Sequence, residues 1–301
     1  MNQSGIYGGL ADQSGINGGL AAERAVDIQG SSPFQISGER ERQRELELKL
    51  AALQKDYADL HTALFEAAQV HRRLCAPRLV RHDDFEIASE IFAGRYLPGD
   101  FFTVETTDCG VSLALGDICG KGLAAGMWTT HLAGLVGSHT AGGPEPQAII
   151  AGVNRDLCRM SFVAPLVSLF LARLDPATGR LDYSNAGHPA PLLLRANGRL
   201  ELLSEGGPLL GAIPGASFAG GSVVLGAGDV LLACSDGILE SRNEADHEFG
   251  SERLEAQLRS ARTGSAEAAL FSVLGAVQDF AAACPLVDDM TLVIVRRCAG
   301  F

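Results

Sequence analysis

The sequence is short of positive charge. Its 24 Lys and Arg residues stand against 36 Asp and Glu, which gives a formal net charge of −12. Proteins that bind nucleic acid or anionic membranes non-specifically use clustered Lys and Arg to neutralise phosphate groups. The charge balance therefore argues against both kinds of surface, and it favours proteins or cations as partners.

Paired cysteines and long apolar runs are also lacking. The seven cysteines are odd in number and form no C-x-x-C pair, which favours reduced thiols over a disulfide framework or a zinc site. No uninterrupted apolar stretch reaches the roughly 18 residues of a membrane-spanning helix, and no charged-then-apolar signal opens the chain. We therefore expect a cytoplasmic protein without membrane insertion.

The 301 residues are 47% hydrophobic and 20% charged, a mixture typical of globular domains. The first part, residues 1–37, is rich in glycine and opens with a ten-residue repeat, QSGIYGGLAD followed by QSGINGGLA. Two copies are too few for a solenoid. The glycines favour a disordered tail, and the matching Ile and Leu positions leave open a short docking or self-association motif.

Residues 38–75 predict one long helix, because this segment has no proline and no internal glycine after Gly38. Apolar residues follow alternating steps of four and three, the pattern of a left-handed coiled coil. The seam begins with Leu46, Leu50, Leu53, Tyr57, Leu60 and Leu64. We interpret it as the interface of a parallel homodimer; the alternative is a single amphipathic helix that packs on its own domain. Pro77 ends the helix.

Residues 76–301 alternate short apolar runs with turn residues and predict about ten strands. The segments DPATGR and ANGR are expected to be hairpin loops, with Asn197 and Gly198 both at positive φ in the second. Helices are expected over 122–139, 145–160, 251–261 and 265–283. Along the sequence, several strands follow one another before a helical segment interrupts them. This order predicts an α+β fold, in which helices cover two packed antiparallel sheets.

The stretch ALGDICGKG, residues 113–121, presents Asp117 at the end of a strand. It lacks the glycine and the Ser or Thr of a P-loop. Further carboxylates stand at strand edges: Asp100, Asp236, Asp288 and Asp289. Ionised aspartates gathered in one place imply a cation, and all-oxygen ligands favour Mg²⁺ or Mn²⁺. Taken singly, each such aspartate is more often part of a turn, and composition and spacing alone do not reject that interpretation.

The ordered motifs GD-F-F, GDICGKG, NAGHPAPLL, GDVLLACSDGILESRN and DDMTLVIVRR span roughly residues 83–298. Together they resemble the SpoIIE/RsbU branch of bacterial metal-dependent PPM serine/threonine phosphatases. This resemblance implies a PPM-type α/β/β/α sandwich of two antiparallel sheets flanked by helices, here preceded by the coiled-coil helix. It places the phosphatase domain at residues 76–301.

The resemblance also implies the site. Asp117 would bridge two Mn²⁺ or Mg²⁺ ions, assisted by the backbone carbonyl of Ile118 and with Asp100 beside them. Asp236 and Asp288 would complete the second ion's shell, Asp288 being preferred over Asp289 because the family's ligand comes first in the pair. Asp117 and Asp236 are thus the candidate catalytic residues, around a metal-activated hydroxide.

Two positions depart from the family pattern. Thr103 stands where a second aspartate often follows, which puts an extra ion in doubt, and Lys121 replaces a frequent His. Lys121 is interpreted either as a solvated surface residue or as a group that attracts substrate phosphate. His188 is expected to pin a turn, and Met127 and Trp128 to belong to the core.

The implied reaction is hydrolysis of phosphoserine or phosphothreonine on a STAS-type anti-sigma-factor antagonist in a partner-switching pathway. The alternative is a catalytically silent binding or scaffold protein that acts through its coiled coil and N-terminal repeats. We further hypothesise that dimerisation positions the helix near 122–136, and through it Asp117. The substrate, the activating signal and the metal used in the cell do not follow from the sequence.

Overall fold

The computed structural model describes residues 33–74, 79–94, 97–107, 110–160 and 164–298. The repeat predicted as a tail lies outside the described residues. By its internal contacts the chain divides into two compact units, with the boundary between Asp59 and Leu60. Within the described ranges, no helix combines the length and apolar character that crossing a membrane requires.

The long helix expected over 38–75 is present as α1 (Pro33–Leu74). Its seam side chains are largely exposed: Leu46 by 61%, Leu53 by 66% and Tyr57 by 67%. Leu50 and Leu60 are exposed to a similar degree, and Leu64 is partly buried. The predicted apolar row therefore lies mostly uncovered along α1.

The first sheet is antiparallel throughout and has the order β1-β2-β12-β11-β7-β8. Its strands are β1 (Leu79–His82), β2 (Phe85–Phe92), β7 (Leu192–Leu194), β8 (Leu200–Leu202), β11 (Val230–Cys234) and β12 (Met290–Arg297). The short edge strand β1 was not predicted. The buried β11 and β12 form the middle of the sheet, which is why both are almost uniformly apolar.

The second sheet has the order β10-β6-β5-β4-β3. Its strands are β3 (Asp100–Thr107), β4 (Gly110–Ile118), β5 (Val167–Asp175), β6 (Arg180–Ala186) and β10 (Gly221–Val224). These strands pair antiparallel. The two-residue β9 (Gly206–Gly207) pairs with β6 in parallel, so the prediction of purely antiparallel pairing was wrong at this one strand.

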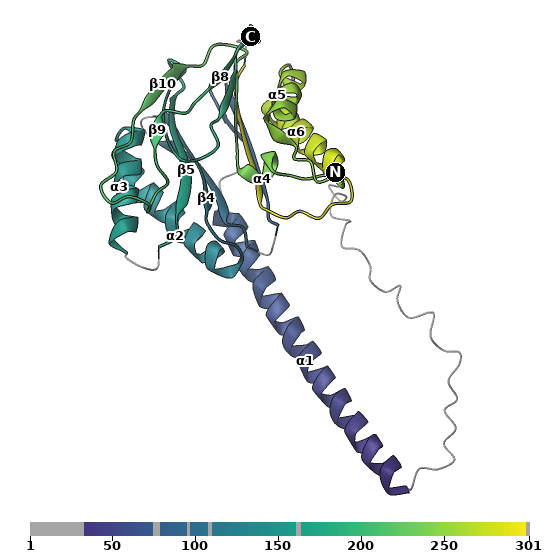
Figure 1. Ribbon diagram of the computed structural model, residues 1–301. Helices are drawn as coiled ribbons and strands as arrows, with labels where there is room; N and C mark the ends of the chain where they lie inside the picture. Colours follow the sequence, from purple (N-terminus) through teal and green to yellow (C-terminus); the bar gives the residue numbers. More distant parts are fainter. Residues whose placement is uncertain (1–32, 75–78, 95–96, 108–109, 161–163, 299–301) are drawn as a thin grey trace. The chain divides into compact units, whose positions relative to one another are not determined.

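Helices cover the outer faces of both sheets (Figure 1). On the second sheet lie α2 (Leu123–Thr140) and α3 (Pro146–Arg159). On the first lie α4 (Asp236–Leu239), α5 (Gly250–Ala261) and α6 (Ala266–Ala281). The predicted α/β/β/α sandwich is therefore confirmed.

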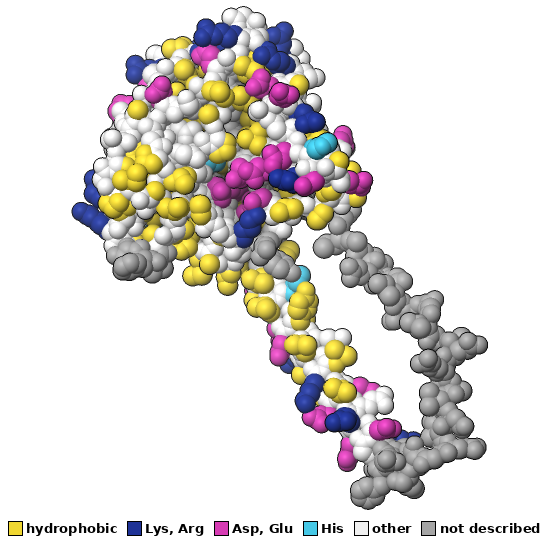
Figure 2. Space-filling model, viewed as in Figure 1, with side chains coloured by type: hydrophobic (Ala, Val, Ile, Leu, Met, Phe, Trp, Pro, Cys, Tyr) yellow, Lys and Arg dark blue, Asp and Glu magenta, His cyan; other side chains and the backbone are white. Residues whose placement is uncertain are grey.

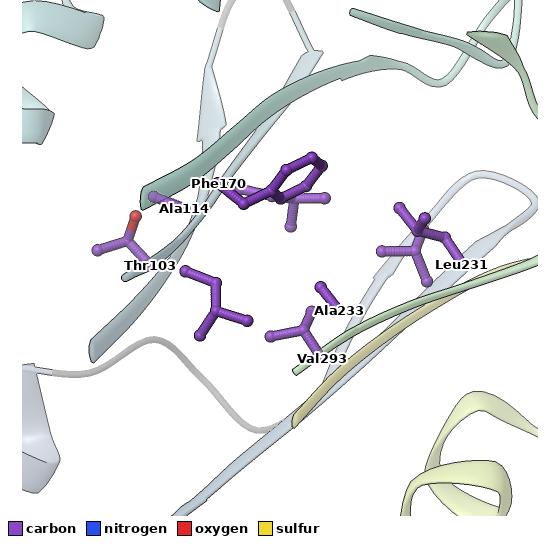
Figure 3. A pocket seen from close by; sticks show the side chains of 9 residues that line it. Thr103, Ala114, Phe170, Leu231, Ala233 and Val293 are labelled. Atoms are coloured by element: carbon purple, nitrogen blue, oxygen red, sulfur yellow. The ribbon is translucent and has the colours of Figure 1, made fainter. Parts of the chain in front are cut away.

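Apolar side chains from the facing strands fill the space between the sheets. Phe102, Val104 and Leu115 come from the second sheet, and Val293 and Val295 from the first. A small cavity remains in this layer, and Figure 3 shows Phe170, Leu231 and Val293 around it. The cavity lining is almost entirely apolar, so this layer is a packing interface and not a candidate catalytic site.

Two local expectations were wrong. In the loop between β7 and β8 only Gly198 has a positive φ, 89°. The amide of Gly198 donates to the carbonyl of Arg195, and the amide of Arg195 to that of Arg199, so the loop has three residues and a single left-handed position. Met127 is 68% exposed on α2, whereas Trp128 packs against the core as expected.

Candidate active site

The register of the second sheet brings two of the predicted aspartates together. Asp100 opens β3 and Asp117 nearly closes β4, and the antiparallel pairing places them directly opposite each other. Alternation along β3 and β4 puts both side chains on the face that carries Phe102 and Leu115, toward the other sheet. The predicted neighbours Asp100 and Asp117 therefore share one face.

The other two aspartates come from the first sheet. Asp236 follows β11 as the first residue of α4, and Asp288 lies two residues before the start of β12. Because β11 and β12 pair antiparallel, the end of β11 lies beside the start of β12, and both carboxylates lie at the same end of these strands. In Figure 2 acidic side chains gather on one face, where Figure 1 labels α4.

Electrostatics links these carboxylates across the two sheets. Burial, followed by the charges of Asp236 and Asp288, raises the pKa of Asp117 to about 6, while a hydrogen bond with Asp100 opposes the rise. Burial and then the charge of Asp288 also raise the pKa of Asp236. Residues from opposite sheets thus form one mutually repelling group.

Asp100 is the most deeply buried of the group, with 2% of its surface exposed. Burial raises its pKa well above the usual range, and the neighbouring charge of Asp117 adds to this rise. The hydroxyl of Thr291 donates to Oδ2 of Asp100 at 2.6 Å. Asp100 is consequently held in a fixed orientation by Thr291.

Oxygen atoms also converge beside Gly99. A Cβ placed on this glycine would lie 3.1 Å from the carbonyl oxygen of Gly120, 3.3 Å from that of Ile118 and 3.6 Å from Oδ1 of Asp117. The carbonyl predicted as a ligand, that of Ile118, therefore faces the same small space as a predicted carboxylate. An all-oxygen cradle of this kind suits hard cations such as Mg²⁺ or Mn²⁺.

No three His, Cys, Asp or Glu side chains in the described ranges lie close enough together to form a ready-made set of metal ligands. In this structure the carboxylate of Asp288 instead contacts the ammonium of Lys121 and accepts a hydrogen bond from a backbone amide. Nζ of Lys121 lies 2.6 Å from Oδ2 of Asp288, and the amide of Asp289 donates to its Oδ1 at 2.9 Å. The donor types, carboxylates and carbonyls, fit a hard cation.

Sequence reasoning missed the role of Asp289. Its carboxylate accepts from the amides of Gly94 at 2.7 Å and Gly99 at 2.6 Å, both in the connection between β2 and β3. Asp289 thereby ties the start of β12 to the segment that leads into Asp100. The two bonds explain why the second aspartate of the pair is buried while Asp288 is partly exposed.

His188 has the structural role that was expected. Its backbone amide donates to Oδ1 of Asn185, and Nδ2 of Asn185 donates back to its carbonyl, which closes the turn. Its ring lies 2.8 Å from the hydroxyl of Ser168, the residue paired with Asp117 on β5. Burial lowers the pKa of His188 to about 3, so the ring is neutral. It contacts β5, the strand that pairs with β4 at Asp117.

The thiol nearest in sequence to Asp117 is not an activated nucleophile. Burial and the charges of Asp117 and Asp236 raise the pKa of Cys119, which disfavours its thiolate. The chemistry of the site is therefore that of carboxylates and carbonyls. Fold and site together define a class: a two-sheet α/β/β/α sandwich whose sheets both contribute acidic oxygen donors suited to divalent cations.

Comparison with known proteins agrees with this class. Residues 107–298 match the family model described as Stage II sporulation protein E (SpoIIE). The chain therefore belongs to the SpoIIE family of PPM-type protein phosphatases. The match covers more than half of the chain and includes Asp117, Asp236 and Asp288.

Individual relatives are distant. Protein IcfG of Synechocystis is 23% identical over 265 residues, which cover 78% of this chain and 41% of IcfG. The phosphoserine phosphatase RsbU of Bacillus subtilis is 22% identical over 235 residues, 77% of this chain and 69% of RsbU. The chain thus spans about two fifths of IcfG and a larger part of RsbU.

Among solved structures, the SiaA-PP2C domain of Pseudomonas aeruginosa has the same fold. It superposes with a TM-score of 0.69 at 20% identity, over 82% of this chain and 99% of that domain. At this identity the likeness concerns the fold alone. It agrees with the observed sandwich of two sheets between helices.

Proposed function

We propose that the chain is an active, metal-dependent protein serine/threonine phosphatase. The observation that carries this proposal is the group formed by Asp100, Asp117, Asp236 and Asp288, which come from both sheets. Burial and then the charges of neighbouring carboxylates raise the pKa of Asp100, Asp117 and Asp236. A fold gathers repelling carboxylates in one place when a cation is to neutralise them. The residues that would hold two Mn²⁺ or Mg²⁺ ions are these four, with the carbonyl of Ile118.

Bound there, hard divalent cations would supply an activated water as nucleophile and neutralise charge on the phosphoryl group. The chain's own residues prepare the site. Thr291 orients Asp100, Asp289 holds the segment before β3, and Ser168 with His188 supports the strand of Asp117. Asp117, with a pKa of about 6, is largely ionised at neutral pH and is available to accept a cation.

The proposed substrate is a phosphorylated STAS-type anti-sigma-factor antagonist. The family resemblance supports this class, as does the similarity to RsbU, itself a phosphoserine phosphatase. Within the described part of the chain, the lysine beside the acidic site, Lys121, is already paired with Asp288. Recognition of the phosphate would therefore depend on the neutralised site.

The exposed row on α1 supports a homodimer. Leu46, Leu50 and Leu53 are each more than half exposed, and Tyr57 and Leu60 continue the row. Burial of such a row against a second copy would stabilise a parallel coiled coil. The last turns of α1 also contact α2, because the ring of buried His71 lies 2.7 Å from the hydroxyl of Thr129. This contact supports the hypothesis that α1 influences the loop of Asp117 through α2.

The decisive experiment measures hydrolysis of p-nitrophenyl phosphate and of a phosphoserine-bearing STAS protein by the full chain. We expect turnover with Mn²⁺ or Mg²⁺, none with EDTA, and a loss of at least about 100-fold in Asp117→Asn. Asp279→Asn, which removes an exposed carboxylate on α6, is the matched control and should retain activity.

Absence of turnover under every condition, with a folded and dimeric chain, would overturn the catalytic proposal. It would favour the silent scaffold instead. Asp236→Asn offers a second test, because a variant that binds but does not hydrolyse should co-purify with its phosphorylated substrate.

A further inference from the structure

Lys121 is an unusual cation in this chain. The lysines of the sequence are Lys49, Lys55 and Lys121; the remaining cationic residues are arginines. Lys49 and Lys55 lie on α1, so Lys121 is the single lysine among residues 60–301 of the sequence. This one lysine stands between two glycines, four residues after Asp117.

The contacts of Lys121 point at the acidic site. Nζ lies 2.6 Å from Oδ2 of Asp288 and 3.2 Å from the carbonyl oxygen of Val287. The side chains of Lys121 and Asp288 are 39% and 40% exposed, so water reaches both partners. The ammonium of Lys121 therefore binds a carboxylate oxygen of Asp288, which under the proposed function would be a ligand of a divalent cation.

The backbone around Lys121 is shaped for this contact. Gly120 and Gly122 have φ values of 132° and 82°, which L side chains rarely adopt. A Cβ at either glycine would meet nothing within 4 Å, so conformation and not space requires glycine there. The two glycines turn the chain between Ile118 and the start of α2, and Lys121 is carried at the turn.

The choice of lysine over arginine is also informative. Arginine grips a carboxylate through two parallel hydrogen bonds, whereas the lysine ammonium is a compact, strongly hydrated point charge on a flexible stem. A lysine can therefore leave a carboxylate for water more readily. Lysine is therefore better suited than arginine to pair with a carboxylate that must exchange its side-chain cation for a metal ion.

We propose that Lys121 is an internal counter-ion that competes with a divalent cation for Asp288. The inference rests on the proposed function, since it concerns the same site. Cation binding displaces the ammonium from Asp288, and because Lys121 lies on the turn into α2, occupancy of the site is coupled to the position of that turn. Lys121 thereby sets how much cation is needed to fill the site.

The first test is calorimetric titration of the full chain with Mg²⁺ and Mn²⁺. Lys121→Gln should bind the cation about two- to five-fold more tightly, the range that a partly exposed ion pair allows. Lys121→Arg should bind no more tightly than the wild type. Lys49→Gln, which removes the same charge from an exposed pair with Glu45, is the matched control and should leave the affinity unchanged.

The second test follows the ammonium itself. Reductive methylation with ¹³C-formaldehyde preserves the positive charge of lysine and labels the three side chains for NMR. The Lys121 signal, identified by its loss in Lys121→Arg, should shift when Mg²⁺ is added and should shift likewise in Asp288→Asn. The signals of Lys49 and Lys55 should stay in place.

The outcomes separate this inference from the proposed function. If the wild type binds cations but Lys121→Gln binds them with equal affinity and the Lys121 signal does not move, the counter-ion role is wrong and the metal site stands. If the wild type binds neither cation in the millimolar range, both proposals are overturned.

Discussion

Removal of one carboxylate from the acidic site should stabilise the metal-free protein. After burial, the charge of Asp236 contributes most to the raised pKa of Asp117, and the pKa of Asp236 is itself raised by burial and then by the charge of Asp288. In Asp236→Asn the amide has nearly the same shape as the carboxylate and carries no charge. The folded state therefore loses repulsion while its packing is largely retained.

The magnitude follows from the pKa of Asp117. A shift from 3.8 to about 6 corresponds to about 3 kcal/mol, but burial causes the largest part of it. Asp236 is only half-buried, so solvent screening reduces its share further. We expect Asp236→Asn to raise the free energy of unfolding by about 1 kcal/mol at pH 7.5, or roughly 2–4 °C in Tm for a domain of this size.

The sign depends on pH. A carboxyl whose pKa is raised in the folded state carries no penalty below its unfolded pKa, near pH 4, and its full penalty above about pH 6. The gain from Asp236→Asn should therefore vanish at pH 4 and reach its full size above pH 6. In saturating Mn²⁺ the wild type should be the more stable of the two proteins, because cation binding stabilises it more than it stabilises Asp236→Asn.

Thermal unfolding of the wild type and of Asp236→Asn, in EDTA and in Mn²⁺ and at pH 4 and pH 7.5, gives the difference in Tm under each of the four conditions. Asp279→Asn, on the exposed face of α6, supplies the matched control and should change Tm by less than about 1 °C. The reasoning is refuted if Asp236→Asn destabilises the metal-free protein at pH 7.5, since the carboxylates would then not repel one another.

Two further predictions concern protons and oligomeric state. Because Asp117 must lose its proton to accept a cation and its pKa is about 6, Mg²⁺ affinity should fall up to about ten-fold per pH unit below pH 6 and level off above pH 7, as titrations across this range would reveal. Substitution of Leu53 and Leu60 by Ser should convert a dimer into a monomer in analytical ultracentrifugation and alter the phosphatase rate. A monomeric wild type, or a monomeric variant with unaltered rate, would contradict the coiled-coil hypothesis.

The main strands were predictable because each has a one-sided or wholly apolar pattern between turn residues. β5 and β12 occupy the predicted segments, since buried strands are read directly from apolar runs. The edge strand β1 was not predicted because its four residues, LVRH, are too few for an alternation of apolar and polar side chains to distinguish a strand from a loop. Met127 was misassigned because α2 is apolar on most of its surface, so hydrophobicity alone does not show which side faces the sheet.

The candidate site was only partly predictable. The acidic residues follow from strand-edge positions and the family resemblance, but the roles of individual oxygens depend on tertiary closure. Asp289 reaches the amides of Gly94 and Gly99 across 195 and 190 residues of chain. Nothing in the local sequence DDMT distinguishes a carboxylate that clamps a connection from one that faces solvent. Thr291 and Ser168 escaped for the same reason.

The structure balances the negative charge of the site in different ways at different depths. Burial raises the pKa of Asp100 and so favours its neutral form, while partly exposed Asp288 is paired with the ammonium of Lys121. Asp117 and Asp236, between these extremes, are held near one another at a cost in stability. On the proposals above, a cation that enters would displace the ammonium of Lys121 and relieve the repulsion between the carboxylates. On the same proposals, its apparent affinity would depend on the ionisation of Asp117 and on Lys121, and its ligands would come from both sheets.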